Sequence, residues 1–410
     1  MTAVEPSRLV ESARPLLDAI DRPLYLIAAG KAAWPMTRAF LATPPRPLRN
    51  GVIACPRIDG DPLPGPLEWF EASHPFPNQG SVAAAHRALE VARDARAAGG
   101  VVLVLLSGGA SAMLTAPAEG LTLADKIATA RALMHAGLAI GELNCVRKHL
   151  SRVKGGHLGA AAGRTVTLAI SDVHAPVADD PSVIGSGPTV ADPTTFEEAL
   201  AITSAVEVPR AVRGHLERGA AGETPETIKP GDPRLAEAAY EVIGNRLTAL
   251  SGARAAAESL GYRVVTLAEP TSGEAREAAA VFVDRAATHA ARESGPMCVL
   301  AAGETTVTVT GRGLGGRNQE FALAAAPFVE ALRDEAVLAS VGTDGADGPT
   351  DAAGAIVDRS TMDRSLRAGL DWKTILADND AYHFFAPLGD LVRWGATGTN
   401  VGDLQVFLRA

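Results

Sequence analysis

The sequence has few cysteines and few aromatic residues, and both shortages exclude common kinds of site. Its three cysteines, Cys55, Cys145 and Cys298, stand alone, without a CxxC pair. Isolated cysteines argue against a zinc framework and are typical of a protein in a reducing compartment. Aromatic residues make up only 4% of the chain, so surfaces on which nucleic-acid bases could stack should be scarce.

A positive net charge and a long apolar run are also missing. The formal net charge at pH 7 is −9, which argues against a nucleic-acid partner. No stretch approaches the roughly 18 uninterrupted apolar residues of a membrane span. The first residues include Glu5 and Glu11 and lack the apolar core of a signal peptide. We therefore expect a cytoplasmic protein that binds neither nucleic acid nor a membrane.

The length and the local composition predict two domains. A chain of 410 residues exceeds what one hydrophobic core usually supports. Residues 218–234 are dense in Gly, Pro, Glu and Thr, which is typical of a linker. Predicted strands and helices alternate on both sides of this segment, so we expect an α/β fold. The expected domains are 1–235 and 236–410.

A first candidate site lies near the N-terminus. Residues 24–28 are apolar and are followed by Gly30 and Lys31 before a predicted helix. A Gly-Lys turn between a strand and a helix suits a phosphate group, because helix N-termini bind anions. It is not a Walker A loop, and an ordinary solvent-exposed lysine is the alternative.

The most strand-like run in the chain is 101–106, six consecutive apolar residues. Such a run is typical of a central parallel strand covered on both faces. Ligands of open α/β sheets lie beyond the carboxyl ends of these strands. A tight turn without a ligand is the alternative. The residues that follow this strand are small or polar and suit a phosphate or a carboxylate: Ser107, Gly108, Gly109 and Ser111.

A basic helix and an irregular loop come next. Residues 144–158 predict one helix, on which Asn144 and Lys148 share a face one turn apart. This face is either solvated or a site for an anion. Residues 165–170 predict a strand that ends just before Asp172. The long loop that begins there follows a strand, and this position favours a functional role.

In the C-terminal half, residues 299–302 and 306–310 predict two strands joined by a turn that contains Glu304. Four glycines then form a loop before a helix that opens with Arg317 and Asn318. We expect this loop to bring a guanidinium and several free backbone N–H groups to a helix N-terminus, where anions bind well. A flexible surface hairpin is the alternative.

Two further glycine patterns need weighing. The loop at 342–351 carries Asp344 and Asp347, and acidic loops hold Mg²⁺, which prefers oxygen ligands; a solvated acidic turn is the alternative. The glycines at 311–316 match the GxGxxG dinucleotide fingerprint letter by letter. That fingerprint belongs after a buried strand, at the first turn of a βαβ unit. The preceding stretch alternates Thr and Val, so we discount a dinucleotide site.

Seven motifs stand in order along the chain: AAGKAA at 28–33, LLSGGASAM at 105–113, NCVRKHLSRVKGGHL at 144–158, ISDVHAPVADDPSVIGSGPTVADPTTF at 170–196, GETTVTVTGRGLGGRNQE at 303–320, GTDGADGPTDAAGA at 342–355 and TGTNVGDL at 397–404. Together they resemble one family, the MOFRL-type glycerate kinases of the glycerate 2-kinase class. The match spans nearly the whole chain. It departs from the family pattern in the last loop, where Ala396 and Gly402 are unlike the relatives.

The resemblance implies ATP- and Mg²⁺-dependent phosphorylation of D-glycerate at its 2-hydroxyl. It implies a two-domain α/β enzyme, with an N-terminal Rossmann-like parallel sheet flanked by helices, a C-terminal mixed α/β MOFRL domain, and the active site in the cleft between them. The family's lysine in the Gly-Lys turn falls on Lys31, and its arginine falls on Arg317.

The chemistry assigns a role to each candidate residue. Phosphoryl transfer needs positioning and charge neutralisation, which Lys31 and Arg317 would supply, and neither is expected to be a core residue. Asp172 is a candidate base for the substrate hydroxyl. Asp344 and Asp347, or Asp172, are candidate Mg²⁺ ligands. The substrate- and phosphate-binding candidates are Ser107, Gly108, Gly109, Ser111, Asn144, Lys148, Glu304 and Asn318.

Two other functions remain open at this point. Some relatives are labelled hydroxypyruvate reductases, so a nicotinamide-dependent reductase is the second hypothesis, and a non-catalytic sensor of sugar acids is the third. The expected partners are D-glycerate and a nucleotide. The sequence leaves open whether the protein is a monomer or a homodimer.

Overall fold

The computed structural model describes residues 2–57, 63 and 65–410 and divides them into two compact units. The N-terminal unit is Pro6–Ile243, and the C-terminal unit is Gly244–Ala410 together with the start of the chain up to Glu5. The fold class is the expected two-unit α/β architecture. The boundary expected after residue 235 is not observed, because the strand that follows it, β6 (Glu237–Gly244), belongs to the N-terminal sheet.

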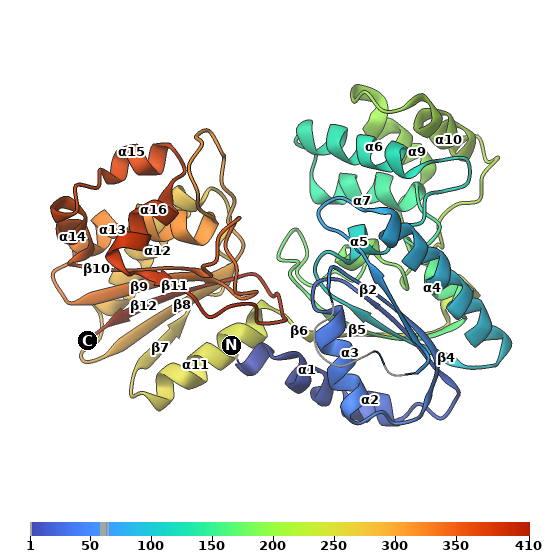
Figure 1. Cartoon of the computed structure of the whole chain (residues 1–410), viewed down its shortest axis with the longest axis horizontal. Helices are drawn as coiled ribbons and strands as arrows, with labels where there is room; N and C mark the ends of the chain where they lie inside the picture. Colours follow the sequence, from blue (N-terminus) through green and yellow to red (C-terminus); the bar gives the residue numbers. More distant parts are fainter. Residues whose placement is uncertain (1, 58–62, 64) are drawn as a thin grey trace. The chain divides into compact units, whose positions relative to one another are not determined.

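The sheet of the N-terminal unit has the order β3-β2-β1-β4-β5-β6, and the strands from β3 to β5 are parallel to their neighbours (Figure 1). Every residue of β1 and β4 is buried, as the apolar run at 101–106 predicts. Helices therefore cover both faces of the sheet centre. The remaining strands are β1 (Leu24–Ala29), β2 (Leu48–Cys55), β3 (Leu67–Glu71), β4 (Val101–Leu106) and β5 (Arg164–Ile170).

Two long helices of this unit begin at the capping signals in the sequence. The side chains of Asn78 and Ser81 cap α4, and those of Thr122 and Asp125 cap α6. The α-helices of the unit are α1 (Pro6–Ser12), α2 (Arg14–Asp18), α3 (Ala33–Ala42), α4 (Gln79–Ala97), α5 (Ala110–Met113), α6 (Leu123–His135), α7 (Ile140–His149), α8 (His157–Ala162), α9 (Phe196–Ile202) and α10 (Arg210–Ala220). Three short 3-10 helices, η2 (Ile184–Ser186), η3 (Thr203–Ala205) and η4 (Pro233–Leu235), connect them.

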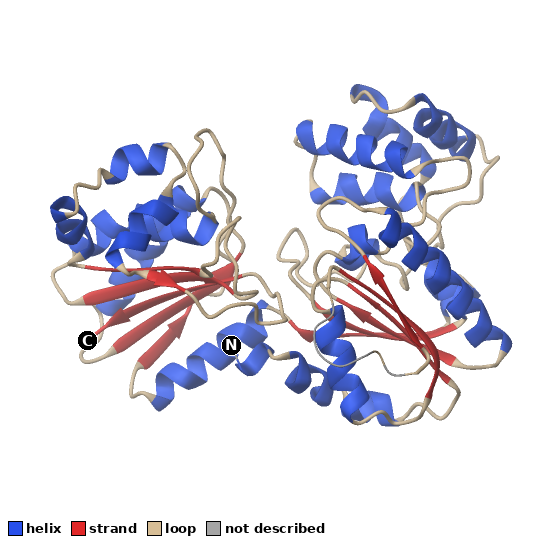
Figure 2. Cartoon of the chain, viewed as in Figure 1, coloured by secondary structure: helices blue, strands red, loops and turns tan. Residues whose placement is uncertain are grey.

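The prediction of a single basic helix at 144–158 is wrong. Helix α7 ends at His149 and α8 begins at His157. Gly155 and Gly156 between them have φ values of 56° and 81°, which glycine adopts without strain but which end a right-handed helix. Helices α6, α7, α9 and α10 instead share their own small apolar core, which includes Leu133, Val146 and Leu216. These helices, labelled in Figure 1, form a group beside the strands of this unit in Figure 2.

The C-terminal unit has a mixed sheet of order β11-β10-β9-β12-β8-β7, in which β12 is antiparallel to both neighbours. The prediction of a hairpin at 299–310 is wrong. Strand β8 pairs with β7 and β12, and residues 307–310 form no strand. The N–H of Thr308 donates to the Glu274 side chain instead. The strands are β7 (Arg263–Thr266), β8 (Met297–Gly303), β9 (Ala336–Gly342), β10 (Gly354–Asp358), β11 (Leu391–Val392) and β12 (Asp403–Arg409).

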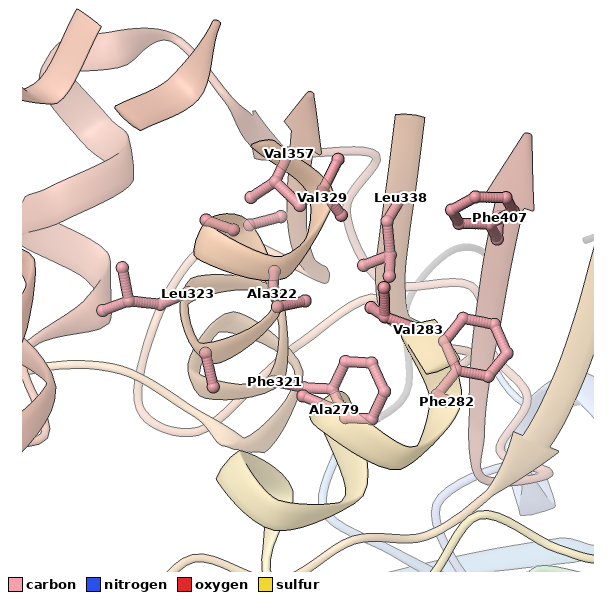
Figure 3. Packing of buried hydrophobic residues seen from close by; sticks show 14 of the residues in the cluster. Ala279, Phe282, Val283, Phe321, Ala322, Leu323, Val329, Leu338, Val357 and Phe407 are labelled. Carbon is pink, nitrogen blue, oxygen red and sulfur yellow. The ribbon is translucent and has the colours of Figure 1, made fainter. Parts of the chain in front are cut away.

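Helices cover both faces of this second sheet. On one face, Phe282 of α12 and Phe321 of α13 pack together with their rings 5.9 Å apart, close to Leu338 of β9 and Phe407 of β12 (Figure 3). On the other face, α11 packs against β8. The helices are η1 (Thr2–Val4), α11 (Arg246–Ser259), α12 (Ala275–Ala290), α13 (Arg317–Glu330), α14 (Thr361–Arg367), α15 (Trp372–Ala377) and α16 (Ala381–Leu388). Among the described residues, no helix has both the length and the apolar character needed to cross a membrane.

Candidate active site

The carboxyl ends of β1 and β4 bring together the two turns that the sequence singles out. The strand order reverses between these neighbours, which is where open α/β sheets place their ligands. The N–H of Lys31 donates to the Gly108 carbonyl at 2.9 Å, and the N–H of Ala32 donates to Ser107 Oγ at 2.9 Å. A Cβ on Gly30 would lie 2.3 Å from Ser107 Oγ. Only glycine at position 30 allows this approach.

A chain of hydrogen bonds links the second turn to α7. Ser111 Oγ lies 2.8 Å from Ser186 Oγ, and the Ser186 hydroxyl donates to Asn144 Oδ1 at 2.9 Å. Since Ser186 has one hydroxyl proton, Ser111 is the donor to Ser186. Asn144 is 3% exposed, and its Nδ2 is buried without a hydrogen-bond partner. Ser111 and Asn144, both predicted from the sequence, therefore lie close together.

Lys148 is bound within the protein rather than turned toward a ligand. Its ammonium is buried and pairs with Asp192 Oδ1 at 3.2 Å. Burial alone would raise the pKa of Asp192, but Lys148 and hydrogen bonds from Thr194 and Thr227 lower it below its usual value. Lys148 therefore has a structural role in a buried ion pair that joins α7 to the segment at 192–194. This pairing does not fit its predicted role in substrate binding.

Asp172 lies two residues beyond the end of β5, the strand beside β4. It is half-buried. This position is at the same edge of the sheet as the turns after β1 and β4, because the carboxyl ends of parallel strands meet at one edge. Its role as a base stays a prediction.

In the C-terminal unit, Arg317 at the start of α13 is held by two carboxylates. Its Nε and Nη2 donate to the two oxygens of Asp403 at 2.6 and 3.0 Å, and its Nη1 donates to Glu304 at 2.6 Å. Burial alone would lower the pKa of Arg317, but Asp403 and Glu304 raise it above its usual value. The Asp403 side chain is fully buried, so Arg317 also has a structural role.

Asn318 and Asp347 lie beside this pair. The backbone N–H groups of Asn318 and Gln319 donate to the Asp347 carboxylate at 3.0 and 2.8 Å, so Asp347 caps α13. The Asn318 amide donates to Asp347 and, at 2.9 Å, to Asp403. Burial, with a contribution from Asp403, raises the pKa of Asp347 to about 6.

These contacts do not fit the predicted role of Asp347 as a Mg²⁺ ligand. Both of its oxygens accept hydrogen bonds from α13, and the residue is 2% exposed. Asp344 is half-buried and accepts the N–H of Ala346. In the part of the chain that the structure describes, no group of three or more His, Cys, Asp or Glu side chains could hold a metal ion.

The N–H groups of residues 310–314, in and beside the glycine loop, are bound within the protein and not free as the sequence predicts. The N–H groups of Thr310 and Gly311 both donate to Asn379 Oδ1 at 2.9 Å. Those of Arg312 to Leu314 donate to the neighbouring residues Asp378 and Asp380. The glycines are needed for packing, since a Cβ on Gly313 would lie 2.3 Å from Asp380 Cβ. The loop does not directly follow a strand. The GxGxxG match therefore lacks the strand that a dinucleotide-binding turn requires.

A cavity of about 520 Å³ lies elsewhere in the N-terminal unit. Its lining includes His149, His157, His215, Arg152 and Arg218. None of the site residues predicted from the sequence lines it, so this cavity is not the candidate active site.

Comparisons with known proteins cover both units. The model described as "Domain of unknown function (DUF4147)" matches residues 1–217, and the MOFRL family model matches 297–403. A glycerate 2-kinase of Pyrococcus horikoshii is 38% identical over 95% of this chain and 88% of its own length. The crystal structure of a glycerate kinase from Thermotoga maritima has a TM-score of 0.87 and 35% identity, covering 100% of this chain and 96% of that chain. The chain belongs to the glycerate kinase family.

Relatives in the glycerate kinase family carry two kinds of name. A protein of Agrobacterium vitis that is named a hydroxypyruvate reductase is 39% identical over 93% of this chain and 86% of its own length. The family resemblance drawn from the seven motifs is confirmed.

Two residues of this glycerate kinase family member escaped the sequence reasoning. Asp403, the partner of Arg317, lies in the motif TGTNVGDL at the start of β12, and an acid just before a buried strand was the available signal. Arg147 lies inside the basic motif of α7, in which the sequence reasoning selected only Asn144 and Lys148 as candidates.

Proposed function

We propose that this protein is a glycerate 2-kinase, which transfers the γ-phosphoryl group of ATP to the 2-hydroxyl of D-glycerate and releases 2-phosphoglycerate and ADP. The observation that carries the proposal is the 35% identity and TM-score of 0.87 to a glycerate kinase over the full chain. The Gly-Lys turn at the point where the strand order reverses supports it, since this is a favourable place for a phosphate group.

The proposed roles follow the charge that develops during transfer. Lys31 and Arg317 stabilise the phosphoryl oxygens, as cations do in phosphotransferases. Asp172 accepts the proton of the substrate hydroxyl. Asp344 or Asp172 would hold a Mg²⁺ ion on the nucleotide, which would neutralise phosphate charge; Asp347 fits this role less well, because its carboxylate is occupied by α13.

The reductase hypothesis lacks a structural basis. It rested on the reductase labels of some relatives and on the GxGxxG match. At that match, the backbone N–H groups at 310–314 already have partners at 378–380. A dinucleotide pyrophosphate would need such groups to be free.

Two parallel assays test the proposal. The protein is incubated with D-glycerate and MgATP, with ADP release as the readout, and separately with hydroxypyruvate and NADH. We expect ADP only in the first assay, and phosphorus NMR should identify 2-phosphoglycerate. NADH consumption without ADP release would support the reductase, silence in both assays would favour a sensor, and a product with only the 3-phosphate signal would contradict the regiochemistry.

A further inference from the structure

Arg147 on α7 is a partly buried guanidinium for which the described residues provide no counter-ion. Across the described residues, it makes no hydrogen bond and no ion pair with another side chain. Burial lowers its pKa, and no carboxylate offsets that effect. Arg317 and Arg364 show the contrast, because each of these partly buried arginines is bound by an aspartate. An arginine in such a place usually has an anionic partner.

The ionisable groups that interact with Arg147 are basic rather than acidic. The pKa of Lys126 is lowered to about 7, first by burial and then by Arg147, and the pKa of Lys154 is lowered by burial, Lys126 and Arg147. Burial, Lys31 and Arg147 together lower the pKa of His74. His74 itself lies against the second turn, where a Cβ on Gly109 would be 3.2 Å from its ring. The region therefore gathers basic side chains beside the predicted site, and because an arginine keeps its proton, Arg147 is the member of this group that stays charged while the pKa values of Lys126, Lys154 and His74 are lowered.

Asn144 supplies an independent sign of a missing ligand. It lies three residues before Arg147 on α7, so the two side chains share a face of the helix. Its Oδ1 accepts the hydrogen bond from Ser186, and its Nδ2 is buried without an acceptor. A buried donor without a partner is costly and rare. An oxygen anion placed here would satisfy the amide and the guanidinium at once.

From this juxtaposition we propose that Arg147 and Asn144 bind the carboxylate of the glycerate substrate. The inference rests on the proposed kinase function and adds the residue that selects for an acid. The guanidinium forms the ion pair, and Asn144 Nδ2 donates a hydrogen bond to the same carboxylate. Lys148 does not take part, because Asp192 already neutralises it. The enzyme should then reject glycerol, which lacks the carboxylate and would leave both groups unpaired.

The test compares three purified variants with the wild type in the ADP-release assay. Arg147→Gln removes the charge. Asn144→Asp keeps the size and the bond from Ser186 but turns a carboxylate toward the substrate, within reach of Arg147. Arg152→Gln is the matched control. Arg152 is an exposed arginine five residues further along the chain, and its substitution removes the same charge from the protein. KM and kcat are measured for D-glycerate and for ATP, with glycerol as a second acceptor.

We expect KM for D-glycerate to rise by about 30- to 100-fold in Arg147→Gln and at least as much in Asn144→Asp, the range for losing a hydrogen-bonded charge. KM for ATP should stay within about twofold, and Arg152→Gln should match the wild type. Preference for glycerate over glycerol should shrink by the same factor. Unfolding in urea checks the fold, and if Arg147→Gln does not fold, Asn144→Asp carries the test.

The outcomes separate the two proposals. If the wild type does not phosphorylate D-glycerate, the proposed function fails and the inference fails with it. If the wild type is active but both site variants keep their KM for glycerate, the carboxylate site alone is refuted. A rise in KM for ATP, with glycerate unaffected, would place Arg147 on the nucleotide and would equally overturn the inference.

Discussion

Arg317 is bound to a buried carboxylate, and this pairing determines what its substitution does. Arg317→Ala would leave the fully buried Asp403 side chain without its counter-ion. Breaking a buried ion pair in this way costs about 3–5 kcal/mol. Arg317→Lys keeps the charge and should lose less stability, yet it loses the planar fork and should still lower turnover strongly. Urea unfolding and kcat, measured on both variants, separate the two effects.

The control for this prediction is the partner residue. Arg317→Ala combined with Asp403→Ala removes both charges, so it should be more stable than Arg317→Ala alone. An Arg317→Ala variant as stable as the wild type would show that the ion pair contributes nothing to folding.

Asp347 should make the stability of the protein depend on pH. Its pKa is raised from 3.8 to about 6, first by burial. A raised pKa in the folded state means that the protonated form favours folding. The contribution is complete below about pH 4 and is lost as the pH rises through about 6, on the order of 3 kcal/mol in total.

The measurement is the free energy of unfolding in urea between pH 4 and pH 7.5, for the wild type and for Asp347→Asn. The variant does not titrate at this position, so the wild type should lose stability relative to it as the pH rises. A difference between the two proteins that stays constant with pH would show that the pKa of Asp347 is unshifted.

At the scale of helices and strands, the sequence predicted those elements whose signals are local. The apolar run at 101–106 is β4, and Asn78 and Thr122, residue types that favour helix starts, cap α4 and α6. The alternation of Thr and Val at 306–310 failed as a strand signal. Its backbone is bound by Glu274 and Asn379, partners tens of residues away that no local pattern reveals.

Helix α7 shows the same limit for side chains. Its helical periodicity placed Asn144 and Lys148 on one face, and this was sufficient to find a candidate site. It could not show that Asp192, more than forty residues later, would neutralise Lys148. Nor could it show that Arg147 would have no acidic partner among the residues that the structure describes, because the counter-ions of a helix come from the segments packed against it.

The Lys148–Asp192 pair should therefore act mainly on stability. Lys148→Met leaves the fully buried Asp192 unpaired and should cost about 3–5 kcal/mol. Lys148→Met combined with Asp192→Asn should recover part of that loss, because no buried charge then remains. Urea unfolding of the two single variants and the double variant measures the coupling. A fully additive result would mean that the pair is not coupled.

At the scale of the whole molecule, the order of the motifs predicted the family, and composition misplaced the boundary. The segment at 218–234 is linker-like, but α10 extends to Ala220, and the chain returns to the N-terminal sheet as β6 before the second unit begins. A linker is defined by what the chain contacts on either side of it, and those contacts are not visible in composition. The seven motifs predicted the family correctly because they are distributed over both units.

Lys31 and Arg317 belong to different units, so a functional test must decide whether they act on the same phosphoryl group. Lys31→Ala and Arg317→Lys are made singly and together, Lys being chosen at 317 to keep the charge beside Asp403. Each single variant should reduce turnover by about 10³-fold or more, since a cation at the transferring phosphoryl contributes that much. If the two groups act as a unit, the double variant should be little worse than the poorer single variant. Losses that multiply would show that the two residues act independently, and urea unfolding of all three variants must first show that the protein is folded.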